Sequence, residues 1–386
     1  MKKVILHRSS RVLAGHPWIF SNEIAGSPKT FEPGSLVEVL DAKDTFLGIG
    51  YVNPNSLIAV RLLTRQREPI DQSFFSRRIS AALARRTPFI AGRDAYRAVY
   101  SESDQLPGLI VDRFGECISV QILTLGMEMQ RELILAALIE VMSPETIVLR
   151  NDSKARTLEG LPLEKSVCKG TLDTLPRIAE GSVTFEVDPL AGQKTGFFLD
   201  QYENRMALAE LARTGTALDL FCYAGAWGMQ LARHGMQVTF VDDSETAIQQ
   251  VIRNAELNGM TDHCVPVKDD VFSFLKRKIA AGASFDVVVC DPPAFVKNKA
   301  KIKEALRGYR DVNAMCMKLV REGGILATSS CSHHIDRESF LDMLRHAARD
   351  AGRAPRVLEY RSQGKDHPVL LAAPETEYLK CVFLQF

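Results

Sequence analysis

Two polar segments that directly follow apolar runs have residue types suited to covalent chemistry. Asp291 follows the run 286–290 and precedes two prolines, which cannot continue a strand ladder and therefore fix a stiff loop. Cys331 follows the run 324–329 in the polar sequence SSCSH. A thiolate is a strong nucleophile once a cation or a helix N-terminus lowers its pKa. The spacing predicts a nucleophile and a carboxyl group at two strand ends.

A glycine-rich turn lies upstream, in the sequence ALDLFCYAGAWG of residues 217–228. Gly225 and Gly228 stand where a dinucleotide-binding fingerprint has its second and third glycines, but Tyr223 replaces the first. Asp219 lies at the end of the preceding apolar run, where its carboxylate can accept hydrogen bonds from an ammonium group. The turn thus predicts a nucleotide-like ligand with a cationic end.

Two further aspartates follow the next two apolar runs. Asp242 lies seventeen residues after Gly225, where a carboxylate can accept both hydroxyls of a ribose. Asp270 follows the third run, where it could face an adenine amino group. Three acidic residues at successive strand ends fit S-adenosylmethionine better than a dinucleotide, whose pyrophosphate prefers a positive lining. The alternative is an ordinary set of strands, turns and helices with aspartate caps.

These residues need a sheet that brings strand ends together, and the periodicity beyond residue 183 provides one. Strands are predicted at 217–221, 237–241, 264–267, 286–290, 324–329, 356–360 and 379–386. Helices are predicted between the first six of them, at 227–234, 245–257, 271–281, 301–320 and 337–351. This alternation predicts an α/β fold with a mostly parallel seven-stranded sheet and helices on both faces. Ligands bind such sheets at the carboxyl ends of the strands.

The first 180 residues follow a different pattern. Short β-like runs at 4–6, 36–40, 46–52 and 58–63 are separated by turn signals and predict a small β-barrel. Residues 74–180 mix strands at 109–111, 118–123 and 147–149 with helices at 74–87 and 127–141. We therefore predict three domains: a β-barrel over 1–73, a middle α/β domain over 74–180 and the larger α/β domain over 181–386.

Composition excludes several classes of protein. The chain has 386 residues, 46% of them hydrophobic and 25% charged, which argues against long disorder, collagen-like repeats and coiled coils. No apolar run approaches the roughly 18–20 residues that span a bilayer, and the N-terminal apolar stretch is too short for a signal peptide. We expect a cytoplasmic protein. None of the eight cysteines forms a CxxC pair, so we predict reduced thiols and no metal site.

The motifs in combination resemble a known family. AGQKTGFFLDQYENR (191–205), LDLFCYAGAWG, DDVF, DPPAF and SSCS occur in the order found in class I S-adenosylmethionine-dependent methyltransferases, and most closely resemble the bacterial 23S rRNA cytosine-5 methyltransferases. His16-Pro17-Trp18-Ile19-Phe20 is similar to that family's N-terminal PUA signature, and residues 102–109 and 112–115 are similar to its middle domain. The resemblance covers nearly the whole chain.

The resemblance implies a role for each matching residue. One segment would close over the cofactor, a turn would hold its methionine end, and two aspartates would hold the ribose and approach the adenine. Asp291 would contact the target cytosine, Cys331 would attack it, and Ala294 stands where family members often have a basic residue. The cofactor-binding set comprises Lys194, Thr195, Phe198, Asp200, Arg205, Asp219, Phe221, Tyr223, Gly225, Asp242, Asp270 and Asp291.

The expected reaction forms 5-methylcytosine through a covalent adduct between Cys331 and C6 of the base. The expected partner is 23S ribosomal RNA, naked or partly assembled, with the oligomeric state left open to a homodimer. Alternatives are an amino-group or uracil-C5 RNA methyltransferase, a non-catalytic RNA-binding assembly protein and a small-molecule methyltransferase.

The charge balance of the chain is nearly neutral, at +1, but it hides two basic stretches. Residues 74–97 carry six arginines against Asp94 alone, and residues 297–310 carry six basic residues against Glu304 alone. Each stretch is predicted either to contact RNA phosphates, which would make binding salt-dependent, or to be a solvated helix face.

Overall fold

The computed structural model describes residues 1–295 and 301–386, which form two compact units. The first unit comprises Met1–Ile178, Val187–Leu199 and Lys365–Thr376, and the second comprises Ala179–Glu186, Asp200–Gly364 and Glu377–Phe386. The predicted ranges 1–73 and 74–180 thus fall together in the first unit. Two segments of the range predicted as the third domain, 187–199 and 365–376, also pack within the first unit. The three-domain division itself stays a prediction.

The N-terminal part of the first unit is a five-stranded sheet. Its order is β1-β3-β4-β5-β2, with β1 and β3 parallel and the other pairs antiparallel. Buried aliphatic side chains, among them Val4, Ile19, Val37 and Val60, form its core. The strands are β1 (Lys2–Ile5), β2 (Trp18–Phe20), β3 (Leu36–Leu40), β4 (Phe46–Val52) and β5 (Ile58–Thr64). The predicted runs are confirmed within two residues, and β2 is an additional strand.

A second five-stranded sheet, ordered β10-β9-β8-β7-β6, forms the rest of the first unit's framework. Helices α2 (Gln72–Arg86) and α4 (Arg131–Met142) pack against each other and share one core with this sheet. The strands are β6 (Ala95–Tyr100), β7 (Leu109–Phe114), β8 (Cys117–Ile122), β9 (Thr146–Asn151) and β10 (Glu164–Lys169). Strands β6 and β10 are absent from the sequence-based prediction.

The predicted helix 127–141 is wrong in its extent. The structure has a short helix α3 (Leu125–Glu128) and then α4, which begins at Arg131. The two helices are separated at Met129, which ends α3, and Gln130, which precedes α4 with a non-helical φ of −105°. Gly126 lets α3 pack closely on β4, because a Cβ atom there would lie 2.0 Å from the ring of Tyr51.

The second unit contains a seven-stranded sheet ordered β15-β14-β13-β16-β17-β19-β18. Strand β19 runs antiparallel to β17 and β18, and the other strand pairs are parallel, so the predicted mostly parallel α/β fold is confirmed. The strands are β13 (Thr216–Leu220), β14 (Gln237–Asp242), β15 (Cys264–Lys268), β16 (Phe285–Cys290), β17 (Val320–Ser330), β18 (Arg356–Arg361) and β19 (Lys380–Gln385). The hairpin of β11 (Arg177–Glu180) and β12 (Val183–Glu186) leads into this unit.

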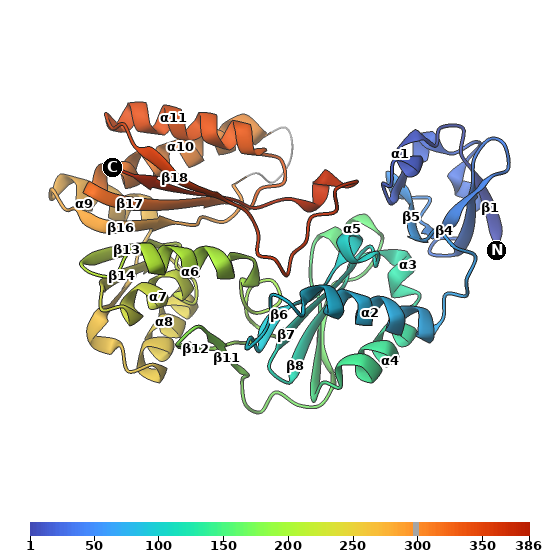
Figure 1. Cartoon of the computed structure of the whole chain (residues 1–386), viewed down its shortest axis with the longest axis horizontal. Coiled ribbons are helices and arrows are strands. Elements are labelled where there is room, and N and C mark those ends of the chain that lie inside the picture. The colour runs from blue at the N-terminus through green and yellow to red at the C-terminus, as the bar shows by residue number, and fades with distance from the viewer. Residues whose placement is uncertain (296–300) are drawn as a thin grey trace. The chain divides into compact units, whose positions relative to one another are not determined.

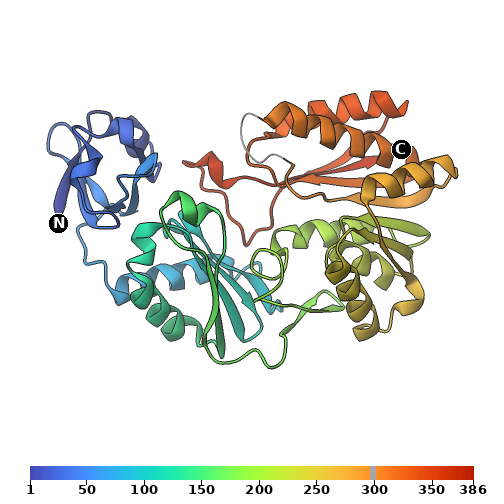
Figure 2. The same cartoon turned by 180° about the vertical axis from the view of Figure 1, so that it is seen from behind.

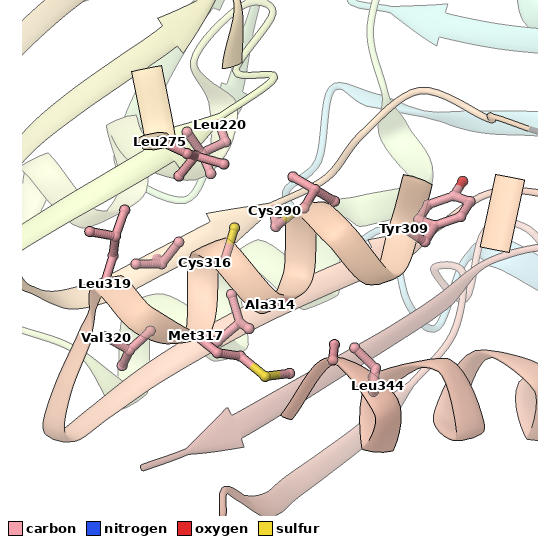
Figure 3. Close-up of a cluster of buried hydrophobic side chains, with 14 of the residues drawn as sticks. Leu220, Leu275, Cys290, Tyr309, Ala314, Cys316, Met317, Leu319, Val320 and Leu344 are labelled. Carbon is pink, nitrogen blue, oxygen red and sulfur yellow. The ribbon is translucent and has the colours of Figure 1, made fainter. Parts of the chain in front are cut away.

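Helices cover both faces of the seven-stranded sheet (Figures 1 and 2). One face carries α6 (Tyr202–Leu211), α7 (Ala226–Arg233) and α8 (Glu245–Leu257), and the other carries α9 (Val271–Ala280), α10 (Ile302–Leu319) and α11 (Arg337–Ala351). The core around α10 includes Cys290 and Cys316, and also Met317, which Figure 3 shows pointing from α10 toward Leu344 of α11. This core fixes β16 and β17, whose carboxyl ends carry Asp291 and Cys331.

None of the helices in residues 1–295 and 301–386 is long and apolar enough to cross a membrane.

Candidate active site

Five parallel strands place the candidate residues of the second unit along one sheet edge. Asp219 is the next-to-last residue of β13, and Asp242 is the last residue of β14. Asp291 directly follows β16, and Cys331 directly follows β17. Because β13, β14, β15, β16 and β17 are parallel neighbours, their carboxyl ends meet at the same edge. The topology therefore brings together residues that are spread over more than a hundred positions of the sequence.

Asp219 is buried with half of its carboxylate unused. Its Oδ2 accepts a hydrogen bond of 2.9 Å from the Gly228 amide, and its Oδ1 is buried without a partner among the described residues. Burial raises the pKa of Asp219 well above its usual value, and the nearby carboxylates of Asp291 and Asp242 add to that rise. A buried, uncompensated acceptor of this kind fits a cationic donor such as an ammonium group.

The turn after β13 holds three residues in the left-handed region. Phe221, Tyr223 and Gly225 have φ angles of 58°, 48° and 75°. Tyr223 therefore adopts the left-handed backbone conformation at the position where a dinucleotide fingerprint has a glycine. Such strain costs on the order of 1–3 kcal/mol per residue and concentrates at functional sites.

Gly228 of the same turn serves helix packing. A Cβ atom at this position would lie 2.2 Å from the ring of Phe240 in β14, so only glycine lets α7 approach the sheet this closely. The close approach also brings the Gly228 amide to Asp219.

The two remaining aspartates of the set are held by backbone amides. Asp242 accepts hydrogen bonds of 3.0 Å from the amides of Tyr223 and Ser244, so it fastens the glycine turn to the end of β14. Asp270 is exposed and caps α9, where its Oδ1 accepts from the Ser273 amide at 2.8 Å. That hydrogen bonding lowers the pKa of Asp270. Asp270 thus has the capping geometry named above as the alternative to ligand binding.

Asp291 is oriented by two neutral donors that sequence reasoning missed. Its Oδ2 accepts hydrogen bonds of 3.1 Å from Gln201 Nε2 and from Trp227 Nε1. Gln201 also donates to the Ser329 hydroxyl at 3.1 Å, on the strand that leads to Cys331. Gln201 and Trp227 are both nearly fully buried. They fix Asp291 relative to β17 while the carboxyl group stays partly exposed.

Cys331 and Cys264 of β15 are the partly exposed cysteines of the described sheet, and burial raises the pKa of Cys264 to about 12. Cys331 is partly exposed, whereas Cys222, Cys290 and Cys381 are buried. Burial raises the pKa of Cys222 well above its usual value and that of Cys381 to about 12, which keeps both as unreactive thiols. Negative charge on Cys331 and on Asp291 adds to the burial that raises the pKa of Tyr309, so both groups lie near this phenol.

The segment 194–205, expected to close over a cofactor, is divided between the two units. Lys194, Thr195 and Phe198 belong to the first unit. There the Lys194 ammonium lies 4.4 Å from the Phe198 ring centroid, and the Thr195 hydroxyl donates to Asp112 at 2.5 Å.

Asp200 and Arg205 belong to the second unit. Asp200 Oδ2 accepts a hydrogen bond of 2.5 Å from the Tyr378 hydroxyl, and Arg205 forms a buried ion pair with Glu180 of β11. These contacts anchor the start of α6 to the C-terminal segment and to the hairpin.

The two basic stretches differ in their surroundings. In 74–97, Arg86, Arg93 and Arg97 are largely buried and pair with Asp104, Asp366 and Asp112, so these three form structural ion pairs. In 297–310, Lys297 and Lys299 lie outside the described residues. Lys303, Arg307 and Arg310 line a groove of about 580 Å³ between α10 and α11, together with Asp342 and Asp350.

No group of three or more histidine, cysteine or acidic side chains with metal-binding geometry occurs in the described part of the chain.

The structure adds Lys380 and Tyr378 to the residues around Cys331. Lys380 is buried at the start of β19 and lies close enough to Cys331 to sense its charge. The sequence does mark Lys380, because a lysine inside the apolar run YLKCVF (378–383) is unusual for a strand with neighbours on both sides. Trp227 and Gln201 carried no comparable signal, since each stands in a helical or mixed segment.

Comparisons with known proteins were made for sequence and for fold. A family model described as "PUA-like domain" matches residues 4–65, and one described as "Conserved hypothetical protein 95" matches residues 204–353. The chain is 38% identical over 379 residues to the "Ribosomal RNA large subunit methyltransferase I" of Klebsiella pneumoniae, covering 97% of this chain and 95% of that protein. It is 37% identical to the protein of the same name from Pseudoalteromonas atlantica, covering 98% of each.

Solved structures show the same fold at lower identity. A SAM-dependent methyltransferase from Streptococcus mutans superimposes with a TM-score of 0.85 and 20% identity over the full length of both chains. The Trm5b protein from Pyrococcus abyssi superimposes with a TM-score of 0.53 and 16% identity, over 71% of this chain and 74% of that one. The first of these superpositions confirms the predicted methyltransferase-type fold over the whole chain.

Proposed function

The chain belongs to the ribosomal RNA large subunit methyltransferase I family, and from that premise we propose that it forms 5-methylcytosine in large-subunit ribosomal RNA with S-adenosylmethionine as methyl donor. One observation carries the proposal. Cys331 and Asp291 stand at the ends of the neighbouring parallel strands β17 and β16, on the same sheet edge as the uncompensated carboxylate of Asp219. A nucleophile, an acid and an acceptor for a cationic ligand are thus adjacent.

The acidic edge suits S-adenosylmethionine, which carries an ammonium group, a sulfonium and a ribose. Asp219 would pair with the ammonium group through its unpartnered Oδ1, and Asp242 would accept from the ribose hydroxyls. Asp270 would face the adenine, and the strained turn would follow the outline of the ligand. We assign the cofactor site to residues of the second unit, Asp219, Phe221, Tyr223, Gly225, Asp242 and Asp270, with Asp200, Arg205 and Asp291 as further members. The roles of Lys194, Thr195 and Phe198 stay predictions from the resemblance. When bound, the cofactor supplies an electrophilic methyl group.

The protein must activate C5 of cytosine, which is a poor nucleophile. Attack of the Cys331 thiolate on C6 forms an S–C6 bond and gives C5 the character of an enamine carbon. Asp291 gives a proton to N3, where negative charge develops. Gln201 and Trp227 fix the orientation of the Asp291 carboxyl group for this transfer. After methylation a base removes the C5 proton, the S–C6 bond breaks, Cys331 leaves as a thiolate, and N3 returns its proton to Asp291.

The target base must be unstacked to reach both groups, which favours loop or partly assembled RNA over a duplex. The PUA-like region at residues 4–65 would supply RNA affinity outside the reaction site. Large-subunit ribosomal RNA is therefore the proposed partner.

The test measures product and rate separately. Purified protein is incubated with S-adenosylmethionine and a 23S rRNA transcript, and the nucleosides are identified by mass spectrometry. We expect 5-methylcytosine, and a fall of at least about 1,000-fold in rate for Cys331→Ser. Cys168→Ser, at an exposed cysteine of the first unit, is the matched control and should keep full activity.

The identity of the product separates the competing functions. A base methylated on an exocyclic amino group, or full activity of Cys331→Ser, would refute the covalent route. A 5-methyluridine product would keep the thiol chemistry but change the substrate base. Absence of both methylation and cofactor binding would favour a non-catalytic RNA-binding protein.

A further inference from the structure

Lys380 occupies an unusual place for a lysine. It is the first residue of β19, is paired in register with Ser330 of β17, and is only 5% exposed. Strand β19 lies between β17 and β18, so the side chain is enclosed by the sheet's own strands and loops. Lysine is almost never buried this far unless its ammonium group has partners.

The partners of Lys380 are two backbone carbonyls, one in the turn that carries Cys331 and one in the segment that enters β19. Its Nζ donates to Ser332 O at 2.6 Å and to Tyr378 O at 2.7 Å. Ser332 is the residue after Cys331, so the ammonium group ties the turn that carries the thiol to the segment entering β19. No carboxylate of the described residues forms an ion pair with Lys380, so its charge is not neutralised by direct contact with an acid.

The charges that act on Lys380 come from several elements. Burial lowers its pKa to about 8, and the negative charges of Cys331, Glu377 and Asp336 oppose this shift. Cys331 is the largest of the three opposing influences. On the other side of the turn, Cys331 and Asp291 both act on Tyr309 of α10, and His333 packs on Tyr378 with ring centroids 5.3 Å apart. Glu377 is itself paired with the exposed Arg337 at 2.9 Å, so Lys380 is the buried cation among these described residues.

We propose that Lys380 is a positioning residue for methyl transfer: it braces the turn that carries Cys331 and, through its ammonium charge, holds the Cys331 thiol as a thiolate. The inference rests on the proposed function of Cys331 as nucleophile. It goes beyond that function by naming the group that makes the thiol reactive at neutral pH.

The sign of the effect follows from electrostatics. A nearby cation favours the charged form of a thiol and lowers its pKa below the ordinary value of about 8.5. The interaction is reciprocal, so the thiolate also keeps the lysine protonated, as its opposing influence on Lys380 indicates. The thiolate–ammonium form of the pair therefore predominates between the pKa of the thiol and the pKa of the lysine.

Alkylation of Cys331 tests the proposal without RNA or cofactor. The full-length protein is treated with iodoacetamide between pH 6 and 10, and modification of the Cys331 peptide is followed by mass spectrometry. In Lys380→Met we expect the pH midpoint of Cys331 alkylation to rise by about one unit, and the rate at pH 7 to fall about tenfold. Lys380→Arg keeps the charge and should keep the midpoint within about 0.3 units of the wild type.

A lysine of the first unit provides the matched control. Lys169 also donates to two backbone carbonyls, those of Pro144 and Glu145, and Lys169→Met should leave Cys331 alkylation unchanged. A merely structural role of Lys380 predicts a different result: the loosened turn would raise the rate at every pH with an unchanged midpoint. That result, or an unchanged profile, would overturn the proposal.

A second comparison keeps the test decisive if Lys380→Met does not fold. Arginine stays protonated at pH 9, where lysine with a pKa near 8 does not. Alkylation of Lys380→Arg should therefore follow a simple single-thiol titration, while the wild type deviates from one above pH 8. Identical profiles for the two proteins would contradict the proposal. A shifted midpoint together with absent methyl transfer would instead uphold the role of Lys380 and refute the proposed function.

Discussion

Asp104 in the first unit and Asp219 in the second are both buried aspartates, but their surroundings are opposite. Burial alone would raise the pKa of Asp104, yet ion pairs with Arg86 and Arg85 and a hydrogen bond from the Tyr100 amide lower it. Burial and the carboxylates of Asp291 and Asp242 raise the pKa of Asp219, and the Gly228 amide and the charge of Arg205 oppose the rise without overcoming it. The fold neutralises the charge of Asp104 and leaves that of Asp219 for something else to neutralise.

The difference extends beyond one pair of residues. In the first unit, Asp112 and Asp366 are as buried as Asp104, and each also has arginine partners. A buried charge without a partner costs several kcal/mol, so a folded protein retains one only where another requirement outweighs stability. We infer that the paired aspartates serve the fold of the first unit, whereas Asp219 serves a ligand.

The largest expected effect comes from breaking a paired aspartate. Asp104→Asn leaves the Arg86 guanidinium buried without its counter-ion and should lower the free energy of unfolding by about 3–5 kcal/mol. Urea denaturation of the variant and the wild type measures this loss. A change below about 1 kcal/mol would mean that the ion pair is not what stabilises this part of the unit.

Asp219→Asn should do the reverse. The asparagine side chain can still accept the hydrogen bond from the Gly228 backbone amide, and the substitution removes a charge that burial disfavours. The ligand-free protein should therefore keep its free energy of unfolding or gain about 1 kcal/mol. Affinity for S-adenosylmethionine should fall about 100-fold, or about 2.7 kcal/mol, because the ammonium group loses its carboxylate. Isothermal titration and urea denaturation give the two quantities. A marked loss of stability with unchanged affinity would assign Asp219 to the fold.

The pH dependence of stability should also have opposite signs in the two regions. The pKa of Asp366 is lowered to about 2, because His367 and Arg93 outweigh its burial. Its contribution is therefore fully present above the unfolded pKa of about 3.9 and is lost as pH falls toward 2, by about 2 kcal/mol. The raised pKa of Asp219 means that its ionisation destabilises the fold as pH rises above the unfolded value.

Comparing Asp366→Asn and Asp219→Asn with the wild type at two pH values separates the contributions of the two aspartates. The difference in unfolding free energy between wild type and Asp366→Asn should shrink between pH 6 and pH 3. The corresponding difference for Asp219→Asn should shrink too, but with Asn as the more stable form at pH 6. The same sign for both variants would contradict the contrast between the two regions.

The smallest effect concerns Asp270, which is exposed and caps α9. Asp270→Ser retains a capping oxygen, so the free energy of unfolding should change by less than about 0.5 kcal/mol. If Asp270 also contacts the adenine, as proposed, cofactor affinity should still fall about tenfold. Asp270→Ala serves as the control that loses both functions and should cost about 1 kcal/mol of stability. Unchanged affinity in Asp270→Ser would leave capping as its role.

Prediction from sequence was most successful where local pattern decides structure. The helices at 245–257 and 337–351 and the strands at 36–40 and 46–52 were predicted with the observed bounds, because caps and periodicity mark them. It failed at 127–141, where the backbone leaves the helical conformation at Gln130 within a continuous helical pattern. It also missed β6 and β10, which depend on pairing with strands distant in the sequence.

The sequence by itself determined the order of strands and helices, and with it the edge at which Asp219, Asp242, Asp291 and Cys331 meet. Parallel strands share one direction, so knowing the strands suffices to place their ends. The sequence by itself did not determine which charged side chains have an oppositely charged partner. Six arginines in 74–97 suggested a basic surface, but tertiary pairing gives four of them, Arg85, Arg86, Arg93 and Arg97, to buried aspartates. Likewise, only the fold brings Gln201 and Trp227 to Asp291 and Lys380 to the Cys331 turn. Burial and pairing are properties of three-dimensional contact, and these set the charge and reactivity of each group.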